Sequence, residues 1–257
     1  MMLKQVAVIA CFTLLEARRT RLVWTAVGII VASLVLAECA AGLALTDSQS
    51  YRLVLYATAT RLLFVACTAL FVATSVVREL ADRVIDLTLS RPLSRATWLL
   101  GRVAGYGAMA WLLAVAAALP LVATSTPLAA LVWGVSLAAE LMLVAAATLS
   151  CAVALTQVTA TVLAVAGFYL LARSIDAMVL MSQGPTVAHG AWSSIFIEHA
   201  VAALAMVLPA LGEYTRSAWL NDAAVGVATL PALAIQTVIY GVLLAAVSLF
   251  DFTRREI

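Results

Sequence analysis

Three charged side chains lie inside long apolar stretches of the sequence: Glu38, Arg61 and Glu140. A charge at the middle of a bilayer costs on the order of 3 kcal/mol unless it is paired or faces water. At 1.5 Å per residue, Glu38 and Arg61 lie about 10–12 Å from the same edge of the helices predicted below. We therefore predict that they form an ion pair across the first helical hairpin, as a structural clamp rather than a substrate site.

Glu140 lies deeper in its apolar stretch, and the sequence shows no partner for it at the same depth. Two interpretations remain open. Glu140 either lines a polar pathway through the membrane or takes part in a hydrogen bond to a neighbouring helix. The first interpretation makes it a functional residue, and the second makes it a structural one.

Residue patterns typical of an enzyme or a metal site are missing from the sequence. The four cysteines contain no C-x-x-C pair, and His189 and His199 have no carboxylate at metal-ligand spacing. Neither H-E-x-x-H nor G-x-S-x-G occurs, so the usual zinc and nucleophile signatures of hydrolases are absent. We expect no catalytic, metal or cofactor site in this chain.

The composition requires a protein that lies in lipid. Of the 257 residues, 65% are hydrophobic and only 11% are charged, a balance that the surface of a soluble domain would not tolerate. Several apolar stretches reach the roughly 20 residues that a transmembrane helix needs, whereas strands of a membrane barrel would alternate apolar and polar residues. The predicted fold class is an all-α membrane protein with six transmembrane helices. The predicted spans are residues 22–45, 53–77, 99–123, 128–155, 158–171 and 225–250. The fifth is short for a span unless it extends through Arg173 toward Asp176.

Two segments lie outside these spans. Residues 1–21 contain an apolar run too short to cross a bilayer, followed by Glu16, Arg18 and Arg19, and are predicted to form a helix in the cytoplasmic interface. Residues 173–224 are predicted to be an external or re-entrant segment with short helices before the last span, because their apolar run is only about a dozen residues long. The whole chain, residues 1–257, then forms a single transmembrane domain.

The basic residues predict the orientation of the chain. With six spans both termini lie on one side, and that side holds most of the 15 lysines and arginines. Because loops rich in Lys and Arg stay on the cytoplasmic side, we predict a multi-pass protein of the bacterial inner membrane with both termini in the cytoplasm. The basic residues on this side are Lys4, Arg18, Arg19, Arg21, Arg78, Arg83, Arg91, Arg95, Arg102, Arg254 and Arg255.

The longest predicted cytoplasmic loop, residues 78–98, joins the second span to the third. Leu80, Val84 and Leu87 follow one another at helical spacing, so we predict a short amphipathic helix over residues 78–89. Ser94 is well placed to cap the third span. Such a helix could bind in a groove of a soluble partner and transmit its motion, or its charges could merely anchor the loop at lipid headgroups. The charged residues concerned are Arg78, Glu79, Asp82, Arg83, Asp86, Arg91 and Arg95.

A G-x-x-x-G pattern occurs at the start of the third span, at Gly101 and Gly105. Small residues at this spacing allow another helix to approach closely. The pattern does not identify that helix.

Three features of the chain occur together in one known family. An N-terminal interfacial helix ends in E-A-R-R-T-R, residues 16–21; the loop carries L-S-R-P-L-S-R, residues 89–95, followed by L-L-G-R, residues 99–102; and a broken apolar segment precedes the last of six spans. In these features the chain resembles the type-2, exporter-type permease subunits of ATP-binding-cassette (ABC) transporters. The resemblance covers nearly the whole length.

The resemblance implies that residues 78–89 are a coupling helix seated on a cytoplasmic ABC ATPase dimer. It also implies that a second permease chain, identical or different, completes a central pathway. The chain has no G-x-x-x-x-G-K-[ST] phosphate loop, so ATP and Mg²⁺ would be bound by the separate ATPase. A periplasmic protein is a further candidate partner, and a net charge of +2 gives no indication of a nucleic-acid partner. The alternative is a secondary transporter or channel that needs no ATPase.

Overall fold

Long apolar helices make up nearly the whole structure, a computed structural model that describes residues 2–42, 48–82, 94–182, 192–220 and 223–254. Six helices are long and apolar enough to cross a membrane, and these described ranges contain no strand. The prediction of an all-α fold with six potential spans is confirmed. The six helices are α2 (Leu22–Ala41), α3 (Ser48–Ala81), α5 (Arg95–Thr124), α6 (Pro127–Leu155), α7 (Val158–Ser182) and α9 (Ala223–Arg254).

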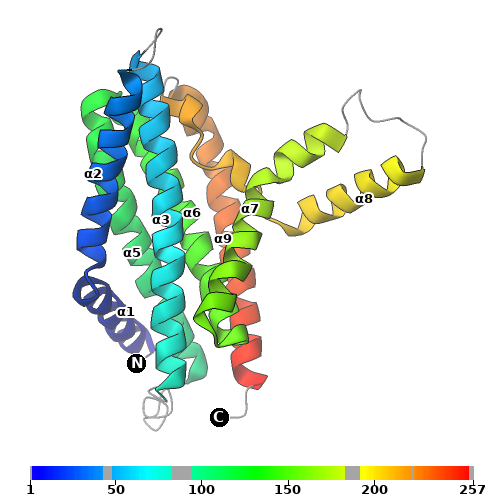
Figure 1. Cartoon of the computed structure of the whole chain (residues 1–257). Helices are drawn as coiled ribbons and strands as arrows, with labels where there is room; N and C mark the ends of the chain where they lie inside the picture. Colours follow the sequence, from blue (N-terminus) through cyan, green and yellow to red (C-terminus); the bar gives the residue numbers. More distant parts are fainter. Residues whose placement is uncertain (1, 43–47, 83–93, 183–191, 221–222, 255–257) are drawn as a thin grey trace.

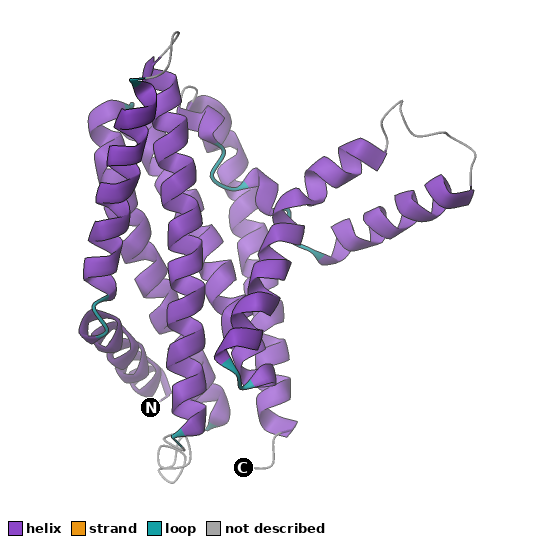
Figure 2. Ribbon diagram, viewed as in Figure 1, coloured by secondary structure: helices purple, strands orange, loops and turns teal. Residues whose placement is uncertain are grey.

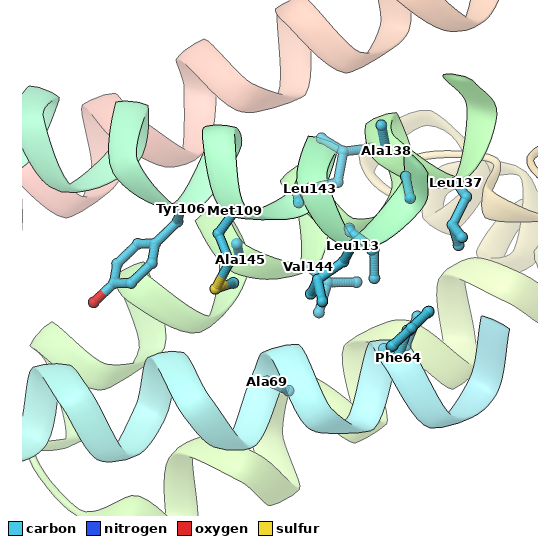
Figure 3. Packing of buried hydrophobic residues seen from close by; sticks show 14 of the residues in the cluster. Phe64, Ala69, Tyr106, Met109, Leu113, Leu137, Ala138, Leu143, Val144 and Ala145 are labelled. Atoms are coloured by element: carbon cyan, nitrogen blue, oxygen red, sulfur yellow. The ribbon is translucent and has the colours of Figure 1, made fainter. Parts of the chain in front are cut away.

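The central helix of the bundle is α6. It packs against α3, α5, α7 and α9, and its most apolar stretch is 72% buried, more than that of any other span. Phe64 of α3, Leu113 of α5 and Leu137 of α6 belong to the core between these helices (Figure 3). Because α6 is covered by its neighbours, a polar group on it meets protein rather than lipid.

Local sequence explains where the central helices begin. The Ser94 hydroxyl accepts a hydrogen bond from the backbone N–H of Thr97 at 3.2 Å, so the predicted cap of the third span is confirmed. The Thr126 hydroxyl caps α6 in the same way, and Pro127 occupies the first turn, where its missing N–H costs nothing. These two caps define where α5 and α6 begin.

The first helix, α1 (Met2–Arg19), lies obliquely against the beginning of α5 (Figure 1). A Cβ atom on Gly101 would lie 2.6 Å from Cβ of Ile9, and one on Gly105 would lie 2.6 Å from Cβ of Thr13. The G-x-x-x-G pattern therefore serves the contact between α5 and α1. The lower end of α9 lies at the same end of the bundle as α1 (Figure 1), and we call this the terminal end.

The segment before α9 differs from the prediction. The fifth span was predicted over residues 158–171, or longer toward Asp176, and α7 continues beyond both to Ser182. Arg173 can lie within this helix because its guanidinium has partners inside the bundle, as described below. A shorter helix, α8 (Trp192–Val207), packs against α7, and α8 and the end of α7 form an arm that projects from the bundle (Figures 1 and 2). Two 3₁₀ turns, η1 (Leu211–Glu213) and η2 (Ser217–Leu220), then return into the bundle.

The predicted loop helix over residues 78–89 is only partly within the described ranges. Its first turn is the end of α3, which continues without a break to Ala81. This part of the prediction is corrected, because residues 78–81 extend the second span rather than begin a separate helix. Residues 83–93 lie outside the described part of the chain.

Candidate functional site

A buried carboxylate organises the middle of the bundle. Glu140 of α6 is fully buried. Its carboxylate accepts hydrogen bonds from the Tyr169 hydroxyl of α7 at 2.8 Å and from the Thr215 hydroxyl at 2.7 Å, and Arg173 Nη1 lies 3.5 Å from Oε1. A charge removed from water needs such partners. Of the two interpretations of Glu140, the structure shows the hydrogen-bonded one.

Arg173 links this carboxylate to the segment before α9. Its guanidinium donates hydrogen bonds to the backbone carbonyls of Leu211 at 2.5 Å and Tyr214 at 3.0 Å. The Tyr214 hydroxyl in turn lies 2.9 Å from Thr237 Oγ1 of α9. Burial raises the pKa of Tyr214 above its ordinary value, so this hydroxyl stays neutral. Through these contacts α7 is tied to η1 and α9.

Thr215 has an unusual backbone conformation, which hydrogen bonds with neighbouring side chains stabilise. Its φ of 48° is left-handed, which a β-branched residue rarely adopts. Its N–H donates to Ser136 Oγ at 2.9 Å, and Arg61 Nη1 lies 3.5 Å from both its carbonyl and its hydroxyl oxygen. The Glu140 network, as we call it, consists of Arg61, Ser136, Glu140, Tyr169, Arg173 and Thr215.

The geometry of the Glu140 network is that of a structural lock. Both carboxylate oxygens of Glu140 already accept hydrogen bonds from side chains of the network. No nucleophile stands beside a free base in it, so it lacks the arrangement that nucleophilic catalysis requires. The network instead joins α3, α6 and α7 to the chain segment that carries η1 and η2.

The predicted ion pair of Glu38 with Arg61 is wrong. Glu38 Oε1 lies 2.9 Å from Arg52 Nη1, with 60% of the Glu38 side chain exposed. Arg61 instead points to Thr215. The pair was predicted only from the equal depth of the two residues in their helices. A side chain on α3 can contact only the elements that lie against its own face of the helix. Arg61 lies on the face toward the segment between α8 and α9.

A second polar cluster lies at the terminal end. Arg102 of α5 is 5% exposed. Its Nη1 lies 2.9 Å from Glu16 Oε2 of α1 and 3.2 Å from Thr13 Oγ1, while its Nη2 forms an ion pair with Glu79 of α3. The planar guanidinium thus joins three helices, a task suited to its five fixed donors.

Two further hydroxyl groups complete this cluster. The Ser75 hydroxyl of α3 donates to the other oxygen of Glu16 at 2.6 Å, and the Tyr106 hydroxyl of α5 donates to Ser75 at 3.3 Å. We call the set Thr13, Glu16, Ser75, Glu79, Arg102 and Tyr106 the Arg102 clamp. It fixes the end of α1, the end of α3 and the beginning of α5 relative to one another.

No protein-family model matches the chain, and no curated protein matches it in sequence. Any functional conclusion therefore depends on the arrangement of these two clusters.

The last helix joins the terminal end beside the Arg102 clamp. Arg95 Nη1 donates to the carbonyl of Phe252 in α9 at 2.9 Å. The rings of Trp98 and Phe252 are stacked, with centroids 5.3 Å apart. Two residues in the first turn of α5 are therefore in contact with the end of α9 as well as close to the clamp.

The residues predicted to contact an ATPase have different environments. Glu79 belongs to the Arg102 clamp and Arg95 contacts α9, whereas Arg78 and Asp82 are exposed at the end of α3. Arg83, Asp86 and Arg91 lie outside the described residues. Arg18 and Arg19 are exposed at the end of α1.

Several residues of the two clusters were not predicted as site residues. Tyr169 and Arg173 stand one helical turn apart on α7, but Thr215 comes from the separate segment between η1 and η2, so no local pattern pointed to the group. Arg102 had been counted only as a basic residue and as part of the L-L-G-R motif, although it stands inside the G-x-x-x-G pattern, between the two glycines that contact α1. Among the described residues no group of three or more His, Cys, Asp or Glu could hold a metal ion; His199 lies on α8, and His189 falls outside the described ranges.

Proposed function

We propose that this chain is the membrane-spanning permease subunit of an ABC transporter. In this proposal it couples ATP hydrolysis by a separate cytoplasmic ATPase dimer to export, or to work on a periplasmic partner. Residues 78–89 contact the ATPase, which holds ATP and Mg²⁺, and a second permease chain completes the pathway. The terminal end of the bundle then faces the cytoplasm of the bacterial inner membrane.

The observation that carries the proposal is the position of the Arg102 clamp on both sides of residues 83–93. The chain enters this stretch from the end of α3 and leaves it at the capped beginning of α5. Glu79, just before it, and Arg102, just after it, form an ion pair with each other. Both flanks of the loop are therefore held as one unit.

This arrangement suits a mechanical link. A force on the loop would act on α3 and α5 together, and through Glu16 on α1, because the buried guanidinium of Arg102 pairs with a partly buried carboxylate of each of the other two helices. Packed helices move as rigid bodies, so a small displacement at one end is carried along the bundle. A loop that only anchored the chain at lipid headgroups would not require its flanks to be fixed to each other.

Co-purification tests the proposal. The full chain is expressed with the cytoplasmic ATPases encoded beside its gene, solubilised in a mild detergent and captured through a tag. We expect one ATPase to be retained by the wild-type chain, and the double variant Asp82→Arg, Asp86→Arg to lose it. The matched control is Asp251→Arg, a charge reversal at the end of α9 and outside the loop.

Two outcomes would overturn the proposal. If no ATPase is retained in any mild detergent, or if the loop variant and the control retain it equally, the loop is not the contact. Transport by the purified chain in vesicles without ATP would instead support a secondary transporter or channel.

A further inference from the structure

An apolar groove opens on the surface of the bundle where α1 turns into α2. Its volume is about 380 Å³, and its walls are formed by α2 on one side and α5 on the other. The wall residues include Ala26, Val27 and Ile30 of α2 and Leu112, Leu113 and Ala116 of α5. The groove exists because α2 packs along α3 while α1 packs along α5, so that α2 and α5 diverge.

The depth of this groove corresponds to one leaflet of a bilayer. The helix α2 has 20 residues, a length of about 30 Å that equals the hydrocarbon thickness of a typical bilayer. The wall on α2 runs from Leu22 to Ile30, which is about 12 Å along the helix and less than half of that thickness. The groove thus begins at the terminal-end interface and ends within the same leaflet.

Positive charge is concentrated at the mouth of the groove. Arg18 is one of its lining residues. Arg18, Arg19 and Arg21 are all exposed, and none of them forms an ion pair with a residue that the structure describes. Three arginines therefore lie close together in the chain here, and no carboxylate of the described residues pairs with them. Unpaired arginines at the edge of the hydrocarbon attract anionic headgroups.

We propose that this groove binds one anionic phospholipid. An acyl chain occupies the apolar walls, and Arg18 binds the phosphate group. Arg19 and Arg21 add positive charge around the headgroup. Charge complementarity at the mouth selects this occupant over a zwitterionic lipid, and the apolar walls select a lipid over a free phosphate. The site does not depend on the transport mechanism proposed above, because it involves neither the loop nor an ATPase.

Lipid counting on the intact protein tests this proposal. The full chain in detergent is titrated with dioleoyl phosphatidylglycerol or dioleoyl phosphatidylcholine, and bound lipids are counted by mass spectrometry of the intact complex. We expect the first phosphatidylglycerol to bind about ten-fold more tightly than the first phosphatidylcholine, and Arg18→Gln to lose about five-fold of this affinity. Lys4→Gln is the matched control, since it removes one exposed charge from the same helix.

A second pair of variants tests the apolar walls. Val27→Phe fills the groove at a position that is 47% exposed, and we expect it to weaken binding of both lipids. Val35→Phe, two turns further along α2 and 57% exposed, adds the same bulk outside the groove and should change neither affinity. Glycerol phosphate, which has the headgroup chemistry but no acyl chain, should not compete.

Each contrary result would overturn the proposal. Equal affinity for the two lipids, or an equal effect of Lys4→Gln and Arg18→Gln, would show that no headgroup site exists. Unchanged binding in Val27→Phe, or full competition by glycerol phosphate, would show that the groove does not hold an acyl chain. Exclusion of every lipid because the wild-type chain dimerises through this groove would assign the surface to a second copy.

Discussion

Glu16 Oε2 lies 2.9 Å from Arg102 Nη1, although 86 positions separate the two residues in the chain. This contact attaches α1 to α5, which is one of the six helices long and apolar enough to cross a membrane. Since Arg102 also pairs with Glu79, the relative positions of three helices at the terminal end depend on one guanidinium. The first prediction concerns that group.

Arg102→Ala should destabilise the protein strongly. It leaves Glu16 and Glu79, each partly buried, without their cation. Breaking a fully buried pair costs roughly 3–5 kcal/mol, and because the two glutamates retain some exposure we expect about 2 kcal/mol here. Unfolding of the purified protein in mixed micelles with increasing dodecyl sulfate measures the loss. Arg18→Ala is the control, and a similar loss in both variants would contradict a specific role for Arg102.

Gly105→Ala should disturb the packing of α1 on α5. The new Cβ would lie 2.6 Å from Thr13 Cβ, which no rotamer change can relieve. Overpacking of this kind costs about 1–3 kcal/mol, more than the roughly 1 kcal/mol that alanine gains over glycine in a helix. Gly167→Ala is the matched control, because nothing lies within 4 Å of a Cβ at Gly167. Thermal unfolding midpoints in detergent should fall for Gly105→Ala and stay equal or rise for Gly167→Ala.

Tyr169→Phe should cost more stability than the same substitution at Tyr56. The Tyr169 hydroxyl donates to the buried carboxylate of Glu140 at 2.8 Å, whereas the Tyr56 hydroxyl donates to the neutral carbonyl of Ala117 at 2.9 Å. Hydrogen bonds to charged groups are the stronger ones, so we expect losses of about 1.5 and about 0.6 kcal/mol in unfolding free energy.

A double-mutant cycle identifies the origin of that difference. If the charge of Glu140 strengthens the hydrogen bond, Tyr169→Phe should cost only about 0.6 kcal/mol in a Glu140→Gln background. A cost that is unchanged in this background would mean that the charge of Glu140 does not strengthen the hydrogen bond.

Glu38→Gln should change stability by less than about 1 kcal/mol, as expected of an exposed ion pair. The Glu38 and Arg52 side chains are 60% and 34% exposed, so hydrogen bonds to water replace most of the interaction that either side chain loses. A charge-reversal cycle distinguishes the possible partners of Glu38. Exchanging the charges of Glu38 and Arg52 should restore any loss seen in the single variants, and exchanging those of Glu38 and Arg61 should not. Rescue by the second exchange would support the original prediction from depth.

Much of the fold could be predicted from the sequence because it depends on local properties. Apolar stretches of sufficient length predicted six helices, and Ser94 predicted the beginning of α5. The weakest prediction was the end of the fifth span. The sequence left open whether this span extends through Arg173, and Arg173 continues α7 because its charge is satisfied by residues from elsewhere in the chain.

The sequence by itself determined that this chain forms long apolar helices, where most of them begin, and that glycines at positions 101 and 105 allow a close helix contact. Only the tertiary structure decided which helix makes that contact and which groups pair with Glu38, Arg61, Arg102 and Glu140. The physical reason is that hydropathy and capping act within a few residues, whereas an ion pair depends on which helix faces meet. Residues 13, 16, 75, 79, 102 and 106 form the Arg102 clamp because three helices meet there.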